Sequence, residues 1–229
     1  MKLFLLTIVC CFIVFSGFSQ NKGDQDQFPE IYIDLGPDYT FANAQNLNQW
    51  IINSGQKLPQ YSVSGHLALS FLFRHFGGGL KIFIPNPYRM ETFFFGTRLT
   101  CFNSRFSSWL NLEIGEFDAL YNHLRPVNYT LTPDQQGKSM QLKYDNLYFG
   151  VSNKTYWKHR SKKDLSTEVG IDLMAGYMPW QGSWKYGYYI PSGKTLRFVG
   201  NSVYGIPPID SLFVNVGLFC GLGGSVGSR

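Results

Sequence analysis

The side chains that could do chemistry are few and scattered along the chain. None of the four histidines lies with a Ser and an acid in a pattern typical of nucleophilic or acid–base catalysis. The run of three glycines at 77–79 lacks the Lys-Ser/Thr of a phosphate-binding loop, so it predicts a tight turn. The cysteines show no metal-ligand spacing. We therefore expect no catalytic residue, no metal site and no cofactor.

Charged side chains occur instead within segments that alternate apolar and polar residues. In residues 61–74 the odd positions are mostly apolar and the even positions mostly polar. Residues 165–177 repeat the pattern, with Ile171 on the face opposite Glu168 and Asp172. A period of two predicts β-strands, because facing positions on a helix recur every three or four residues.

The length of these strands indicates a membrane barrel. Strands of soluble domains usually have five or six residues, whereas crossing a bilayer takes about 9–11 tilted strand residues. Beyond residue 19 no apolar run approaches the roughly 18 residues that a membrane helix needs. Charges such as Glu168 would also be rejected by the dry core of a soluble sandwich.

Applying the same pattern to the whole chain gives an even number of strands. The predicted strands are residues 30–36, 61–74, 77–84, 90–103, 106–116, 141–153, 165–177 and 212–222. Their connections alternate between longer and shorter, with one exception at 85–89, as in barrels with long external loops and short periplasmic turns. The predicted fold is all-β, an eight-stranded antiparallel up-and-down transmembrane β-barrel.

The ends of the chain and its composition limit location and partners. Residues 1–19 predict an export signal, with Lys2, an apolar run and a small-residue cleavage site, so that residues 20–229 form the barrel domain. Two cysteines, Cys101 and Cys220, lie outside the predicted export signal. They are predicted to face outward on opposite sides of the barrel, too far apart for a disulfide, and so to be free thiols. The charge of +5 forms no dense stripe, and only 15 % of residues are charged, so no nucleic acid is expected as a partner.

In pattern, length and topology, residues 30–222 resemble the small eight-stranded outer-membrane β-barrel family of Gram-negative bacteria. The family includes OmpA-like, OmpX-like and PorT-like barrels. The resemblance implies a place in the outer membrane, reached through signal-dependent export, and contact with outer-membrane lipids. It implies no particular partner and no oligomeric state.

A barrel of this size has a lumen that side chains can fill, so a wide pore is not expected. Confined charges must pair, because each unpaired one would cost several kcal/mol of desolvation. We interpret the inward charges as a polar plug rather than a gated ion path. The predicted lumenal charge network consists of Asp34, His66, Arg74, Lys81, Arg98, Glu113, Glu168 and Asp172.

The last external loop, residues 178–211, combines aromatic and basic side chains. Such a loop could bind anionic lipopolysaccharide headgroups, glycans or a surface protein. The plainer interpretation, which we favour, is a hairpin that extends beyond the membrane. The candidate ligand-binding residues are Trp180, Trp184, Lys185, Tyr186, Tyr188, Tyr189, Lys194 and Arg197.

The sequence favours a non-enzymatic outer-membrane barrel with a structural or surface-interaction role. One alternative is a lipid-A-modifying barrel enzyme, a kind of small barrel that uses Ser and His at the membrane rim. The other is a soluble exported barrel, similar to lipocalins, which predicts the reverse arrangement: an apolar interior and a polar exterior. Two further expectations concern the wall. The basic run 154–163 is expected to form a periplasmic turn. Aromatic girdles are expected at both rims: Tyr61, Tyr88, Phe117, Tyr144, Tyr177 and Trp180 at the external rim, and Phe73, Phe76, Phe102, Phe106, Tyr156 and Trp157 at the periplasmic rim.

Overall fold

The computed structural model describes residues 30–50, 58–73, 75–84, 88–103, 106–122, 140–160, 165–189, 196–203 and 207–225. The predicted export signal, Arg74 and Lys194 lie outside these ranges. No helix in the described part of the chain is long and apolar enough to span a membrane. The described residues form one helix, α2 (Gln45–Trp50), which is short.

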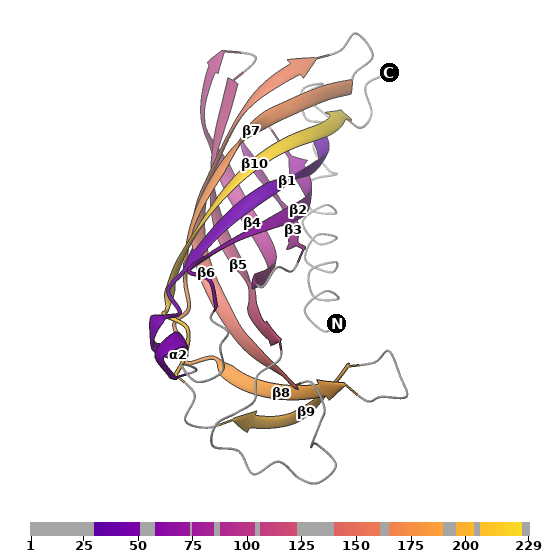
Figure 1. Cartoon of the computed structure of the whole chain (residues 1–229). Helices are drawn as coiled ribbons and strands as arrows, with labels where there is room; N and C mark the ends of the chain where they lie inside the picture. The colour runs from indigo at the N-terminus through magenta and orange to yellow at the C-terminus, as the bar shows by residue number, and fades with distance from the viewer. Residues whose placement is uncertain are drawn as a thin grey trace, which may run out of the picture.

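Eight strands form a closed antiparallel ring, as predicted. Each strand pairs with the next along the chain, and pairing of the last with the first closes the ring (Figure 1). The strands of the ring are β1 (Glu30–Ala42), β2 (Tyr61–Leu72), β3 (Phe76–Phe83), β4 (Tyr88–Asn103), β5 (Phe106–Asn122), β6 (Met140–Arg160), β7 (Leu165–Tyr177) and β10 (Leu212–Ser225).

A hairpin extends the barrel wall at one end. Its strands, β8 (Ser183–Tyr189) and β9 (Leu196–Val203), pair with each other, and β8 pairs with the first residues of β6. In Figure 1 this hairpin and α2 both lie at the lower end of the barrel, which we call the α2 end. Strands β8 and β9 fall within the predicted last external loop.

The strands β1 and β6 run further than the sequence pattern indicated. The prediction ended β1 at residue 36, yet the strand continues through Pro37 to Ala42. Strand β6 continues to Arg160, so the prediction of a turn from residue 154 is wrong. The tight turn predicted at residues 77–79 is also wrong, since these glycines lie in β3.

Apolar side chains face outward and charged ones face inward. Leu67, Leu112 and Val169 are 52 %, 67 % and 58 % exposed, whereas Asp34 and Glu168 are almost completely buried. This facing confirms the predicted orientation. It is the reverse of the arrangement that a soluble binding barrel requires.

The aromatic residues divide differently from the predicted girdles. Tyr61, Tyr177 and Trp157 are exposed on the wall, as the girdles require. Tyr88 and Tyr144, however, are buried inside the barrel, together with Phe117 and Tyr156, so their assignment to girdles is wrong. They occupy inward positions of their strands, where they fill the lumen.

Large inward rings lie opposite glycines on neighbouring strands. Phe213 pairs with Gly176, where a Cβ atom would come within 2.2 Å of the ring. Tyr148 pairs in the same way with Gly115, whose added Cβ would lie 2.8 Å from that ring. At these two positions the lumen accepts the ring because the facing residue has no side chain.

Two clusters of buried apolar side chains occupy the interior. The larger lies toward the α2 end and includes Leu47 of α2, which covers the barrel interior there. The smaller lies toward the opposite end and consists of Tyr32, Leu72, Trp109, Tyr156 and Phe219. The polar part of the lumen lies around and between these clusters.

The contact between Gly176 and Phe213 predicts a selective loss of stability. In Gly176→Ala the new methyl group meets a buried ring, so we expect the free energy of unfolding to fall by about 1–3 kcal/mol. Gly65→Ala is the matched control, because its Cβ would meet only the flexible end of Ile84 at 3.3 Å. Urea titration followed by gel mobility of the folded band measures both. Equal midpoints for the two variants would contradict the packing.

Candidate functional site

The lumenal charges come from six strands of the ring. Because inward positions recur every second residue, each strand contributes one or two polar side chains at a similar depth. These residues are Asp34 and Asp38 of β1, His66 of β2, Lys81 of β3, Glu113 of β5, Lys154 and Lys158 of β6, and Glu168 and Asp172 of β7.

Lys81 is the centre of the first group of contacts. Its Nζ atom lies 2.8 Å from Oδ2 of Asp172 and 3.5 Å from Oδ1 of Asp38. The other carboxylate oxygen of Asp38 contacts Nδ1 of His66. This group ties β1, β2 and β3 to β7 across the lumen.

Two lysines of β6 form a second group. Lys154 pairs with Asp34, and Lys158 Nζ lies 2.6 Å from Oε2 of Glu30. Both ammonium groups also lie over aromatic rings: Lys154 Nζ is 4.4 Å from the centroid of Phe219, and Lys158 Nζ is 5.1 Å from that of Tyr32. The smaller apolar cluster thus takes part in holding the cations.

The structure brings together six of the eight predicted lumenal residues. Asp34, His66, Lys81, Glu113, Glu168 and Asp172 are all buried inside the ring. Arg98 is half-buried and donates to Ser107 Oγ at 2.6 Å, with its guanidinium 5.9 Å from the centroid of Trp109. The position of Arg74 lies outside the described residues.

The sequence reasoning missed Asp38, Lys154 and Lys158. All three lie beyond the predicted ends of their strands, after Gly36-Pro37 in β1 and after Asn153 in β6. The signal was present, because alternation continues through Tyr39 and Phe41 in β1 and through Trp157 in β6.

Acids outnumber permanent cations in this network. Among its described residues, six carboxylates, Glu30 included, accompany three lysines, and neither oxygen of Glu168 accepts a hydrogen bond. A cavity of about 10 Å³, lined in part by Asp34, Lys81 and Glu113, leaves room for about one water molecule. The arrangement is a packed polar layer.

The contact between His66 and Asp38 is the one arrangement here that resembles part of a catalytic constellation. A carboxylate on Nδ1 orients an imidazole as a general base. Their side chains are only 2 % and 0 % exposed, so a lipid or peptide substrate could not approach them. Among the described residues no group of three or more His, Cys, Asp or Glu side chains could hold a metal ion.

The α2 end holds the candidate ligand loop. Trp184 is buried with its ring centroid 4.9 Å from that of Tyr144, and its Nε1 donates to Pro207 O at 3.1 Å. Trp180 is 56 % exposed. Tyr186, Tyr188 and Tyr189 lie on β8 and Arg197 on β9, where only the backbone is described.

Charged residues attach β8 to the barrel. Lys185 Nζ lies 2.7 Å from Oδ2 of Asp145, and Lys143 Nζ lies 3.0 Å from Oδ2 of Asp118 and also contacts Asp145. Lys185 therefore has a structural partner in this structure, as does Trp184.

Comparison with known proteins gives no family. No protein-family model matches the chain, and no curated protein matches it. Among solved structures, the outer membrane protease OmpT from Escherichia coli is 9 % identical, with 90 % of this chain and 99 % of that chain covered and a TM-score of 0.27. A mutant of the TodX monoaromatic hydrocarbon channel is 8 % identical, with 89 % and 91 % covered and a TM-score of 0.21. Similarities this weak carry no argument about function.

Breaking the lumenal network should be costly. Lys81→Met leaves Asp38 and Asp172 without their shared cation, so we expect the free energy of unfolding to fall by about 3–5 kcal/mol. Arg89→Met breaks the half-exposed pair with Glu91 and should cost less than about 1 kcal/mol. Urea titration in detergent micelles compares them. Lys81→Met with Asp172→Asn should recover part of the loss, and no recovery would contradict the pairing.

The hairpin β8–β9 should depend on Trp184. Trp184→Ala removes a buried ring, a change that costs about 3–5 kcal/mol in packed sites, so the hairpin should detach from β6. Trypsin should then cut at Lys185 and Arg197 faster, while the barrel keeps its folded mobility on a gel. Trp180→Ala is the matched control, because Trp180 is exposed. Equal cleavage of both variants would show that Trp184 does not anchor the hairpin.

Proposed function

We propose that this protein is a non-enzymatic β-barrel of the bacterial outer membrane with a structural or surface-interaction role. The observation that carries the proposal is the facing of the side chains: a closed ring with an apolar outer wall and a charged, filled lumen. The predicted export signal is consistent with this location, since it would take the chain out of the cytoplasm.

The outer wall supports a place in lipid. Large apolar side chains are exposed on every strand of the ring, including Leu35, Leu67, Leu112, Val169 and Leu212. A monomeric soluble protein rarely exposes a continuous apolar surface of more than a few hundred Å². Ring closure pairs the backbone groups of each strand with both neighbours, which is the condition for a sheet to cross hydrocarbon.

The filled lumen supports a role other than conduction. Ion pairs of Lys81 and Lys154 cross the middle of the lumen, and apolar clusters lie toward both ends. An ion crossing the barrel would have to separate these pairs and displace rings packed against glycine. We therefore favour a polar plug over a gated path for ions through the lumen.

The hairpin β8–β9 is the part that an external partner could reach. With the N-terminus in the periplasm, β1 runs outward and the α2 end is external. Trp180 is exposed there, and Lys194 and Arg197 add positive charge in the same segment. Anionic lipopolysaccharide headgroups or a surface protein are the partners that this chemistry favours.

Catalysis is not part of the proposal. The enzyme alternative, modification of lipid A, needs an activated nucleophile at the membrane rim, whereas the contact between His66 and Asp38 is deep in the lumen. Mass spectra of lipid A from cells with and without the protein address this directly. Matching spectra are expected, and a new or missing acyl group would overturn the non-enzymatic role.

Location and closure of the lumen can be tested together. We expect the protein in the outer-membrane fraction, with a folded band that migrates faster when the sample is not boiled. In planar bilayers the folded protein should give no stable conductance steps, because the lumen is filled. A soluble protein with one band would overturn the membrane location. Regular conductance steps would overturn the plug.

A further inference from the structure

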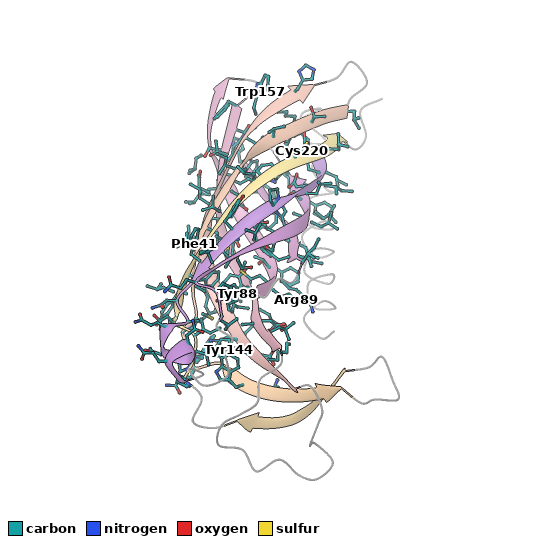
Figure 2. All side chains as sticks on the ribbon, in the orientation of Figure 1. Phe41, Tyr88, Arg89, Tyr144, Trp157 and Cys220 are labelled. Carbon is teal, nitrogen blue, oxygen red and sulfur yellow. The ribbon has the colours of Figure 1, made fainter. Side chains whose placement is uncertain are left out.

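A groove crosses the outer wall of the barrel. It has a volume of about 660 Å³, runs over the outer faces of β1, β10, β7 and β6, and reaches Phe106 at the start of β5. Its exposed walls are apolar: Leu35, Val169 and Ile171 are 60 %, 58 % and 46 % exposed. Trp157 and Cys220 also line it, and Figure 2 places both toward the end of the barrel away from α2.

The groove follows from an irregularity in strand β1. The pairs Leu35↔Cys220 and Asp38↔Gly217 have no pair between them, so the ladder between β1 and β10 is interrupted at Gly36-Pro37. Proline has no backbone N–H to donate to a neighbouring strand, and in sheets it is usually restricted to edges or bulges. A closed ring has no edge strand, so Pro37 lies within the wall and interrupts the pairing between β1 and β10 there.

The floor of the groove is the sheet itself. Gly36, Tyr156, Gly170 and Phe219 line it, and all four occupy inward positions of their strands. The rings of Tyr156 and Phe219 rest against Gly170 on the lumenal side, so no side chain of these four residues rises from the floor toward lipid.

We propose that this groove seats one acyl chain of an outer-membrane lipid. The inference rests on the membrane location proposed above. The groove opens onto the lipid-facing wall, so hydrocarbon is the medium that surrounds it. Its volume lies within the roughly 300–1,000 Å³ typical of small-molecule sites.

The polar groups of the groove favour hydrocarbon over a polar ligand. Oγ1 of Thr155 already bonds to Asn153 Oδ1 at 2.8 Å and to Ser108 Oγ at 3.1 Å. Trp157 is 51 % exposed, and an indole of this kind sits well where lipid tails meet headgroups. The acyl chain would enter beside Trp157 and extend toward Leu35 and Ile171.

Photo-crosslinking tests the groove. The probe is phosphatidylethanolamine with a diazirine in one acyl chain, mixed into vesicles of phosphatidylethanolamine and phosphatidylglycerol that hold the folded, full-length mature protein. Mass spectrometry should find labelling on residues 35–37, 169–171 and 218–220 several-fold above that on the outward residues of β4 and on residues 110–114 of β5, which do not line the groove. Ile171→Trp, which fills the groove, should lower this to the level of the rest of the wall.

Leu112→Trp is the matched control, because Leu112 faces outward on β5 and does not line the groove. It should leave the groove labelling unchanged. Even labelling around the wall would overturn the acyl-chain site while supporting the membrane location, whereas no labelling on any strand would overturn the proposed location too. In a Cys101→Ser background, rapid formation of a disulfide dimer through Cys220 would place a second copy in the groove and overturn the lipid site.

Discussion

The width of an eight-stranded ring is the constraint on which the rest of this structure depends. Such a ring leaves an interior that side chains just fill, so inward residues cannot be chosen independently. Phe213 fits because Gly176 faces it, and Tyr148 fits because Gly115 faces it. The same confinement excludes bulk water, which is why the inward charges pair with one another across the lumen.

The ion pairs join strands that are far apart in sequence. Lys81 and Asp172 are separated by 91 residues, and Lys154 and Asp34 by 120. Neither pair can form until the ring closes, so the pairs specify which strands meet and at which depth. Their net contribution to stability is modest, because desolvation offsets much of the attraction, but the loss of one partner is costly.

Because the lumen is filled, the surfaces open to other molecules are the α2 end and the outer wall. At the α2 end, Trp184 and Lys185 hold the hairpin β8–β9 against β6, so the residues that the sequence suggested as ligand contacts serve partly as anchors. On the wall, a groove lies over the interruption at Pro37 and is lined by residues of five strands. The proposed contacts with lipid and with a surface partner use these two outer surfaces and not the lumen.

The sequence by itself determined the class of fold, the number of strands in the ring and the facing of most residues within the predicted strands, because alternation with a period of two is a local property of an extended backbone. The alternation continues past Pro37 in β1 and past Asn153 in β6, but Gly36-Pro37 and the basic run both resemble turns, so these extensions were missed and with them the inward facing of Lys154 and Lys158. Only the tertiary structure decided which charges meet, which rings oppose glycines and where the wall is grooved. Those features depend on strand tilt and register around a closed ring, which bring together residues that no local pattern connects.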